Sequence, residues 1–391
     1  MRDGWFETPL GEIVELGKGG SWGQDEPGDG LIQAICLRGT DLAELIDGRV
    51  PAAPVRWIKE SELKKSSCSK DMVLIETSGS KCGRSIVLTQ EILDKFDLPV
   101  IYSNFCRTLS IDINKVTKEF VEIWFSHHYA NGLIPSYRAT SAMPNLDVKA
   151  LLRVEIMRVP PLPEQRRIVD LISSVDTYLE ALRQQLESAK ESRNAVLHEI
   201  LQAGGDDWVE HKLIDICEIY QPQTIAKSVM TDDGEFIVFG ANGPIGRYHE
   251  FNHEKSEVVV TCRGATCGTI NMTTPKTWIT GNAMVVSPIT SKVSKNFLYW
   301  ALVAGVDIQS VVSGSAQPQI TREGLAPVKI KIPPLSEQNE IVDLISGFEL
   351  NISHLKDSLS KAKALRSGLL SDLLSGEHEI PAGYDKVMGA A

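Results

Sequence analysis

The residues His249, Glu250 and His253 stand in the order His-Glu-x-x-His. Zinc peptidases use this spacing to place two imidazoles on one face of a helix, with the glutamate as general base. Here Gly246 precedes the segment and the β-branched run Val258–Val260 follows it, which leaves little room for a long buried helix. We therefore predict a loop ahead of a strand, and a zinc-dependent hydrolase using His249 and His253 remains an alternative.

Other sequence motifs of catalysis or cofactor binding are either absent or stand in a context that does not suit them. Adenine methylation would need an Asn/Asp-Pro-Pro-aromatic tetrapeptide, but the Pro-Pro pairs here lie in Val159–Leu162 and Ile332–Leu335. The glycines of Phe239–Gly243 are followed by Pro-Ile-Gly rather than by a helix start, and the sequence holds no Gly-x-x-x-x-Gly-Lys-Ser/Thr segment. We expect no catalytic, cofactor-binding or metal-binding residues in this chain.

The strongest signal is an internal repeat. Pro160–Gln165 and Ile168–Ser173 recur, with one change of residue, as Pro333–Gln338 and Ile341–Ser346, displaced by 173 residues. Each copy continues as an apolar or small-residue seam spaced alternately four and three, broken once by an arginine. The seams are 168, 172, 175, 179, 182, 186, 189, 196 and 200, broken at Arg193, and 341, 345, 348, 352, 355, 359, 362, 369 and 373, broken at Arg366.

These seams predict two helices of about 40 residues, or ~60 Å each. Both begin after a Pro-Pro segment with an acidic first turn and end in glycine, at Gly204-Gly205 and at Gly376. Because neither seam is stable in water alone and an intervening domain must return the chain, we expect an antiparallel coiled coil. Arg193 and Arg366 then either set its register, which we favour, or contact partner subunits.

The regions ahead of the helices are Gly-rich, carry β-branched runs and lack long helical periodicity, so we predict two α+β domains. They are loosely related: Val73–Gly83 matches Val258–Gly268, and Ser141–Leu146 matches Ser315–Ile320. Two near-identical helices fix a geometry, while two diverged domains present different chemistry. This plan fits a pseudo-twofold spacer that holds two different domains at a fixed distance, so that together they recognise an asymmetric, two-part target.

Composition sets further limits. The seven cysteines include no Cys-x-x-Cys pair, which favours reduced thiols over disulfides or a zinc cage. The absence of a long uncharged apolar run predicts a soluble, cytoplasmic protein. The net charge of −11 argues against nucleic acid unless basic residues cluster locally or partner subunits contact the phosphates.

With its paired Pro-Pro-Leu-x-Glu-Gln helix starts, Gly-x-x-Cys-Gly segments and Ser-Ala-x-Pro-x-Leu/Ile segments, the sequence resembles the specificity (S) subunits of Type I restriction-modification systems over almost its whole length. The resemblance implies a non-catalytic, sequence-specific subunit that recognises an asymmetric bipartite site in double-stranded DNA. It also implies that two methyltransferase subunits bind the helical spacer and that motor-nuclease subunits join them to complete the restriction enzyme. S-adenosylmethionine, ATP and Mg would bind those partners, which would methylate adenine and restrict DNA.

On this basis, polar and basic residues in the repeated loops and before each spacer helix are the DNA-reading candidates, because they suit phosphates, guanine or adenine edges. The first domain contributes Ser78, Ser80, Lys81, Arg84, Arg138, Ser141, Met143 and Asn145, with Lys18, Arg38, Thr40, Tyr102 and Asn104 as weaker candidates. The second contributes Arg263, Thr266, Thr269, Ser313, Ser315, Gln317, Gln319 and Arg322, with Gln221, Asn242, Arg247 and Asn282 as weaker ones.

The predicted architecture has five parts. They are a first target-recognition domain (1–159), a first spacer helix (160–205), a second target-recognition domain (206–332), a second spacer helix (333–376) and a C-terminal tail (377–391). Helices of this length can hold two domains on major grooves about one DNA turn, ~34–36 Å, apart. An adaptor that holds proteins rather than DNA is the other alternative, which the negative charge permits.

Overall fold

The computed structural model describes residues 2–140, 144–289, 291–314 and 317–387. The chain forms two compact units. Unit 1 comprises Met1–Glu180 and Ser360–Ala391, and unit 2 comprises Ala181–Leu359. The five segment limits proposed from the sequence stay predictions.

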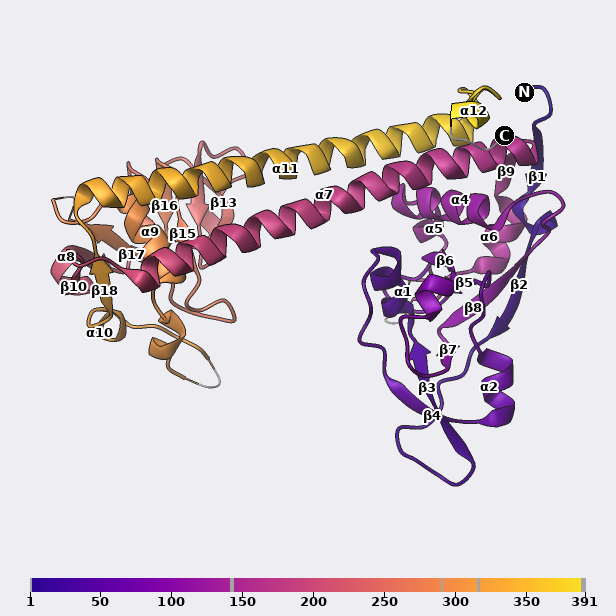
Figure 1. Ribbon diagram of the computed structural model, residues 1–391, viewed down its shortest axis with the longest axis horizontal. Coiled ribbons are helices and arrows are strands. Elements are labelled where there is room, and N and C mark those ends of the chain that lie inside the picture. Colours follow the sequence, from indigo (N-terminus) through magenta and orange to yellow (C-terminus); the bar gives the residue numbers. More distant parts are fainter. Residues whose placement is uncertain (1, 141–143, 290, 315–316, 388–391) are drawn as a thin grey trace. The chain divides into compact units, whose positions relative to one another are not determined.

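Unit 1 contains three sheets with strand orders β2-β8-β5-β6, β4-β3-β7 and β1-β9 (Figure 1). Its strands are β1 (Phe6–Pro9), β2 (Val14–Gly19), β3 (Leu31–Leu37), β4 (Val55–Lys59), β5 (Val73–Glu76), β6 (Ser85–Val87), β7 (Val100–Tyr102), β8 (Cys106–Ile111) and β9 (Ile156–Val159). Its shorter helices are η1 (Leu10–Glu12), α1 (Gly39–Ile46), α2 (Glu60–Ser66), α3 (Gln90–Leu93), α4 (Lys118–Ala130), α5 (Leu133–Ser136), α6 (Val148–Val154) and α12 (Tyr384–Val387).

Unit 2 repeats this plan with strand orders β11-β17-β14-β15, β13-β12-β16 and β10-β18. Its strands are β10 (Val209–Lys212), β11 (Cys217–Tyr220), β12 (Phe236–Phe239), β13 (Pro244–Tyr248), β14 (Val258–Thr261), β15 (Ile270–Met272), β16 (Thr277–Ile279), β17 (Ala283–Pro288) and β18 (Lys329–Ile332). Its shorter helices are α8 (Leu213–Ile216), η2 (Lys227–Val229), α9 (Lys295–Ala304), η3 (Ile308–Val311) and α10 (Arg322–Leu325).

The two sheet systems correspond strand for strand, each strand of unit 1 matching the one nine places later in unit 2. The pairing senses agree too, since β3 and β12 each pair antiparallel with one neighbour and parallel with the other. The loose sequence similarity of the two regions therefore reflects one α+β topology used twice, as predicted.

Strands β5 and β14 are continuous apolar runs because each strand packs against a hydrophobic core on both of its faces. In β5, Val73 and Ile75 enter a core that includes α4, while Leu74 enters a second core shared with α1 and β7. In β14, Val258 and Val260 likewise enter a core different from that of Val259. Because successive side chains alternate across a strand, a strand buried on both faces reads as a continuous apolar run.

The two long helices are α7 (Leu162–Ala203) and α11 (Leu335–Ser375), and every predicted seam position is buried or half-buried. In unit 1 the start of α7 and the end of α11 share one hydrophobic core, which includes Ile168, Ile172, Leu370 and Leu373. In unit 2 the end of α7 packs with the start of α11. This pairing confirms the antiparallel arrangement.

The seam arginines make equivalent cross-helix ion pairs. Arg366 binds Asp176 in unit 1, with Nη2 donating to Oδ2 at 2.8 Å, and Arg193 binds Glu349 in unit 2. Residues 176 and 349 are themselves 173 apart, so the two bonds are related by the repeat. These contacts support the register interpretation.

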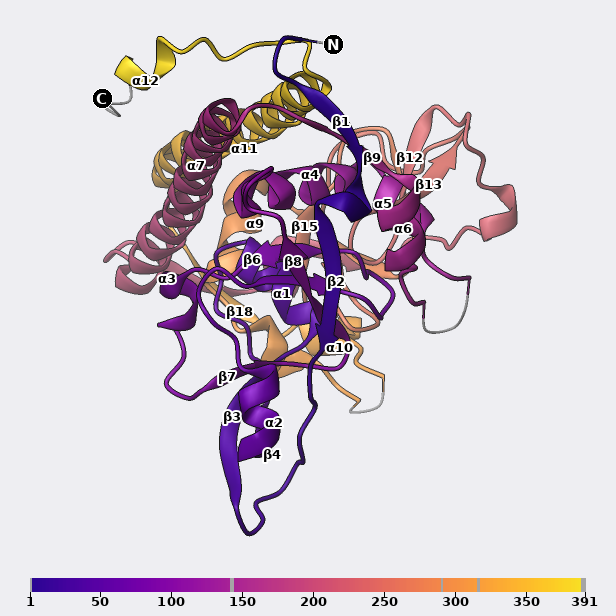
Figure 2. The same cartoon turned by 90° about the vertical axis from the view of Figure 1, so that its right-hand side faces the viewer.

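The Glu-Gln pair at each helix start ties the helix to its recognition domain. The fully buried Gln165 accepts a hydrogen bond from the Thr117 amide (2.8 Å) and donates to the carbonyls of Lys115 (2.9 Å) and Pro160 (2.8 Å). The carboxylate of Glu164 accepts a bond from the indole of Trp5 at 3.0 Å. Figure 2 shows α4, the helix that Thr117 caps, beside α7.

Unit 2 has the same joint. Gln338 accepts from the Ser294 amide (2.8 Å) and donates to Lys292 (3.1 Å) and Pro333 (2.9 Å), each through a backbone carbonyl. Glu337 accepts from the indole of Trp208 at 2.9 Å. The repeated motif therefore exists because one buried side chain satisfies the backbone at the domain-helix junction, where orphan polar groups would be costly.

No helix within the described ranges has the length and apolar character needed to cross a bilayer.

Candidate nucleic-acid interface

Each unit carries one Gly-rich loop clasped by a second segment, and we call each assembly a loop frame. Frame 1 comprises residues 76–84, 138–139 and 144–146. Frame 2 comprises residues 261–269, 309, 313 and 317–320. The first loop of each frame directly follows the central strand β5 or β14.

In frame 1 the two segments are joined by backbone hydrogen bonds. The Gly79 amide donates to Pro144 (2.9 Å), and the Leu146 amide donates to Thr77 (2.9 Å). Between these bonds, Ser78 and Asn145 face each other as an antiparallel bridge pair.

Frame 2 has equivalent bonds at equivalent residues. The Gly264 amide donates to Pro318 (3.2 Å), and the Ile320 amide donates to Cys262 (3.0 Å). Arg263 and Gln319 form the corresponding bridge pair. The sequence correspondence of the two loops is therefore confirmed in space, as is that of residues 144–146 with residues 318–320.

Glycine is required at two positions of each loop. Gly79 and Gly83 have φ of 121° and 109°, and Gly264 and Gly268 both have φ of 91°, a region that side chains with a Cβ rarely adopt. The second glycine closes the loop, its amide donating to Glu76 (2.7 Å) in frame 1 and to Thr261 (2.8 Å) in frame 2. The spacing Gly-x-x-Cys-Gly thus encodes a backbone shape.

The arginines of frame 1 support the loop from inside. Arg84 donates to Glu76 (2.8 Å), and both side chains are largely buried, 12% and 3% exposed. Desolvation raises the pKa of Glu76, and Arg84 opposes that shift. Arg84 therefore neutralises a buried carboxylate.

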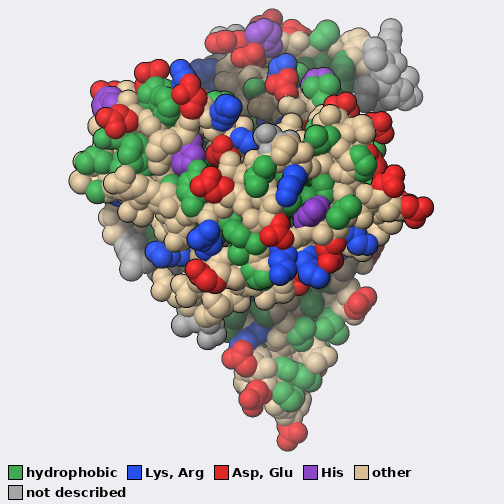
Figure 3. Space-filling model, turned by 90° about the vertical axis from the view of Figure 1, so that its left-hand side faces the viewer, with side chains coloured by type: hydrophobic (Ala, Val, Ile, Leu, Met, Phe, Trp, Pro, Cys, Tyr) green, Lys and Arg blue, Asp and Glu red, His purple; other side chains and the backbone are tan. Residues whose placement is uncertain are grey.

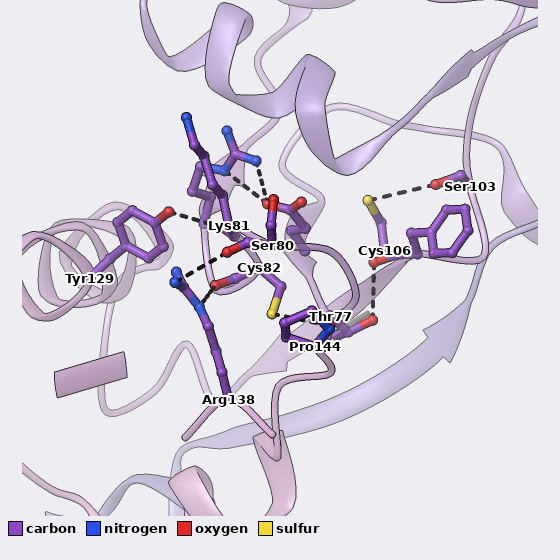
Figure 4. Close-up of polar contacts among 12 residues, drawn as sticks. Thr77, Ser80, Lys81, Cys82, Ser103, Cys106, Tyr129, Arg138 and Pro144 are labelled. Atoms are coloured by element: carbon purple, nitrogen blue, oxygen red, sulfur yellow. Dashed lines mark hydrogen bonds and ion pairs between the residues drawn. The ribbon is translucent and has the colours of Figure 1, made fainter. Parts of the chain in front are cut away.

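Arg138 braces the same loop from the other segment (Figure 4). Its Nε donates to the Cys82 carbonyl at 2.8 Å and its Nη1 to the Ser80 carbonyl at 3.4 Å, while its guanidinium lies 5.3 Å from the centre of the Tyr129 ring. Tyr129 in turn donates to the Lys81 carbonyl at 2.9 Å. Arg138 is thus held by loop carbonyls and a ring.

The outward side chains of frame 1 are short or polar. Ser80, Lys81 and Asn145 are exposed, and the Ser78 hydroxyl donates to Asn145 Oδ1 at 2.5 Å. This bond leaves the amide nitrogen of Asn145 to donate elsewhere.

Frame 2 uses other residues for support. Gln309, which sequence reasoning missed, donates to the Cys267 carbonyl at 3.2 Å, as Arg138 does to Cys82. The Thr269 hydroxyl donates to the Thr266 carbonyl at 2.8 Å, and Ser313 donates from its hydroxyl to Gln319 at 3.2 Å. Gln309 lies outside the repeated motifs, so only its spatial equivalence to Arg138 identifies it.

The outward side chains of frame 2 include a cation. Arg263, Thr266, Gln317 and Gln319 are exposed, and Arg263 forms no ion pair with any of the described residues. Arg322 is also exposed, at the start of α10 just beyond the frame.

The weaker candidates of the first domain lie outside frame 1. Tyr102 is 2% exposed in the core, and Arg38 is bound by Asp41 through two bonds of 2.8 and 2.9 Å at the start of α1. Lys18, Thr40 and Asn104 are exposed, on β2, in α1 and in the turn between β7 and β8.

Those of the second domain are more involved in local bonding. Asn282 is exposed, and its carbonyl accepts from Cys262 at 3.0 Å. The other three are exposed and hydrogen-bonded within unit 2: Gln221 to Gly281 (3.2 Å), Asn242 to Asn271 (2.8 Å) and Arg247 to Gly234 (2.6 Å) and Glu235 (2.8 Å). Ser141, Met143 and Ser315 lie outside the described residues.

The segment with the zinc-peptidase pattern is not helical. His253 hydrogen-bonds to Tyr220 (2.9 Å) and Asn252 (2.6 Å), and His249 lies 3.5 Å from the Thr231 hydroxyl. Within the described part of the chain, no three His, Cys, Asp or Glu side chains converge as metal ligands would. The loop prediction is confirmed, and the geometry that the zinc-hydrolase alternative requires is not formed by these residues.

Surface charge is mixed rather than uniformly acidic. On the face in Figure 3, lysine and arginine side chains are interspersed with aspartate and glutamate. Local basic residues are therefore available despite the net charge of −11.

Comparisons with known proteins agree with this architecture. The family model described as the Type I restriction modification DNA specificity domain matches twice, at residues 3–191 and 205–363. A putative type I specificity subunit from Mycoplasma pneumoniae is 26% identical over 169 residues, 41% of this chain and 44% of that protein. The chain thus matches less than half the length of that relative. The MjaVIII type I specificity subunit from Methanocaldococcus jannaschii is 18% identical over 305 residues, 68% of this chain and 71% of that protein.

Two solved structures have the same fold. The S subunit of a type I restriction-modification system from M. genitalium superposes with a TM-score of 0.58 at 18% identity, covering 95% of this chain and 96% of that one. A chain from a structure titled for complex assembly and conformational transition of the type I R-M system gives 0.60 at 16% identity, covering 96% and 98%. Because the family model matches both repeats, this chain belongs to the family of type I restriction-modification DNA specificity subunits.

Proposed function

We propose that this chain reads an asymmetric bipartite site in double-stranded DNA, each loop frame contacting one half-site. The observation that carries the proposal is that two frames share one backbone geometry but differ in the side chains at the bridge positions, Ser78 and Asn145 against Arg263 and Gln319. Equal frames present their side chains in the same way, so unequal side chains select unequal bases.

The helix pair is proposed to set the spacing of the half-sites. Both α7 and α11 run without interruption from one unit into the other, and their seam is fixed by packing and by the Arg193 and Arg366 ion pairs. A continuous helix resists compression, so the number of unread base pairs between the half-sites should be constant.

Catalysis is proposed to belong to partner subunits. We expect two methyltransferase subunits to bind the helical spacer and motor-nuclease subunits to complete the restriction enzyme, with S-adenosylmethionine, ATP and Mg on those partners. Support comes from the family and from the solved homologue whose title describes assembly of a type I system. Pure chain should therefore show no methyltransferase, nuclease or ATPase turnover, and turnover without partners would contradict this assignment.

The negative net charge of the chain is consistent with a DNA interface that it shares with partner subunits. Phosphate contacts dominate the salt-dependent part of DNA affinity. With a net charge of −11, this chain would contribute local phosphate contacts such as Lys81, while partner subunits would supply many of the others. The assembled complex should thus bind DNA more tightly, and with a steeper salt dependence, than the chain alone.

The test is to co-express the chain with its methyltransferase subunit and map methylated adenines on genomic DNA by single-molecule sequencing. A split asymmetric motif with a fixed spacer that disappears without this chain is the expected result. Methylation that is unchanged when the chain is omitted would contradict DNA reading and favour the adaptor alternative.

A further inference from the structure

We infer that Arg263 and Gln319 are a base-reading pair, and that the half-site read by unit 2 contains a G·C pair next to an A·T pair at the position they contact. This inference rests on the proposed function and assigns the bases to one of its two frames. It follows from which polar groups of the frames are already engaged within the protein.

The frame backbone is largely engaged. In frame 2, the backbone amides of residues 264, 267, 268 and 269 all donate to backbone carbonyls of the same frame. Residues 313 and 319 also bond to each other, the amide of each donating to the carbonyl of the other. Groups that hold the frame together are not available to read bases. Recognition therefore falls to side chains that project from it.

Among the three arginines of the two frames, two are engaged inside the protein. Arg84 neutralises the buried Glu76, and Arg138 is held by Cys82, Ser80 and Tyr129. Arg263 is exposed and makes no ion pair with the described residues, so its fork of donors is not engaged by them. An arginine fork matches the O6 and N7 acceptors of guanine.

The bridge places a second reader beside Arg263. Residues directly opposite each other in an antiparallel pair have Cβ atoms about 4.5–5.5 Å apart and on the same face. Stacked bases are about 3.4 Å apart along one strand. Two long side chains in this arrangement can therefore reach neighbouring base pairs, and the Gln319 amide matches the N6 and N7 edge of adenine.

The equivalent pair in frame 1 has a different capacity. The Ser78 hydroxyl donates to Asn145 Oδ1 and takes up one of its two lone pairs. Ser78 and Asn145 are also shorter than Arg263 and Gln319, and neither carries a guanidinium fork that could match guanine. Frame 1 should discriminate less at this position than frame 2. The two half-sites therefore differ at equivalent positions for a structural reason.

The experiment compares the methylated motifs of the wild-type chain and of Arg263→Ala, each co-expressed with the methyltransferase subunit. The matched control is Lys255→Ala, which removes an exposed cation of unit 2 outside the frame. We expect Arg263→Ala to relax one G·C position of one half-site by about 5- to 150-fold in relative methylation, corresponding to the ~1–3 kcal/mol of a bidentate contact. The other half-site and the spacer should not change, and Lys255→Ala should keep the wild-type motif.

The outcomes separate the two claims. If the wild-type chain gives no split motif, the proposed function fails. If it gives one and Arg263→Ala leaves every base preference intact, or relaxes both half-sites equally, only the present inference fails.

A variant that methylates too weakly to map is tested on purified complex instead. Binding to the wild-type duplex and to single-base variants of the second half-site is measured by fluorescence anisotropy, with assembly checked by size-exclusion chromatography. Loss of discrimination at one position supports the inference, and retained discrimination at all positions overturns it. Gln319→Ala, which removes no charge, provides an independent variant and must relax the adjacent A·T position; if it does not, the assignment of adjacent bases is wrong.

Discussion

The two loop frames have the same backbone and different interiors. Frame 1 is supported by the buried Glu76–Arg84 ion pair, whereas the equivalent residues of frame 2, Thr261 and Thr269, make hydroxyl hydrogen bonds to carbonyls. The shape that they share is therefore set by left-handed glycines and backbone bonds rather than by one particular interior. This explains how side chains on a recognition loop can diverge without loss of the loop.

The largest expected difference between the frames follows from the buried ion pair. Arg84→Ala leaves Glu76 charged and unpaired, and we expect unit 1 to lose about 3–5 kcal/mol of local stability near neutral pH. The equivalent Thr269→Ala should cost unit 2 about 1 kcal/mol or less. Hydrogen exchange with mass spectrometry on peptides of each unit measures both.

A pH series checks the cause. A buried, unpaired Glu76 carboxylate becomes neutral when it takes up a proton. The loss of stability that Arg84→Ala causes in unit 1 should therefore shrink as pH falls from 8 toward 5. A deficit that is equal at both pH values would point to lost packing instead of an unpaired carboxylate.

The domain-helix joints should respond alike, in contrast to the frames. Gln165→Ala and Gln338→Ala each remove three hydrogen bonds and leave buried backbone groups without partners, so each should destabilise its own unit by about 2–4 kcal/mol. Local exchange rates in both units report the effect. Asn339→Ala, at an exposed neighbour, is the control, and a strongly unequal response would show that the joints are not equivalent.

Unit 1 should also show a pH dependence that centres on Glu122. Desolvation raises the pKa of this carboxyl to about 7, although its bond from the Val87 amide (2.9 Å) favours the charged form. The folded state therefore binds a proton that the unfolded state, with an ordinary pKa of 4.5, releases, and stability falls as pH rises from about 4.5 to 7.

Glu122→Gln keeps an acceptor for Val87 and removes the titration. We expect it to match the wild type near pH 4.5 and to exceed it by on the order of 1–3 kcal/mol at pH 8. Thermal unfolding at both pH values is the measurement. Equal stability of variant and wild type across the whole range would contradict the raised pKa.

The smallest expected difference concerns the seam arginines. Arg193 pairs with Glu349 and also lies 5.3 Å from the centre of the Trp300 ring, whereas Arg366 pairs with Asp176. Both pairs are partly exposed, so Arg366→Ala should cost about 1 kcal/mol or less, and Arg193→Ala about 0.5–1 kcal/mol more. A double-mutant cycle of Arg193→Ala with Trp300→Leu measures the contribution of the ring contact. If Arg193→Ala costs the same free energy of unfolding with and without Trp300, the ring contributes nothing.

The sequence predicted much of this architecture because its signals are local or repeated. The four-three spacing of the seams indicated two helices, and the 173-residue displacement indicated that they are equivalent. The Gly-x-x-Cys-Gly segments predicted matching turns, since glycine marks backbone shapes that other residues avoid. The segment with the zinc-peptidase pattern was predicted to be a loop because its neighbours disfavour a helix.

Only the tertiary structure decided which of the predicted site residues are available to bind. Arg84, Arg138 and Arg263 look alike in the sequence, but Tyr129 and the Cys82 carbonyl reach Arg138 from elsewhere in the fold, and Glu76 is buried with Arg84. The Glu-Gln motif was read as a favourable first helical turn, yet its main partners, Thr117 and Trp5, lie about 50 and 160 residues away. Such pairings depend on which segments fold together, so residue type and spacing alone do not specify them.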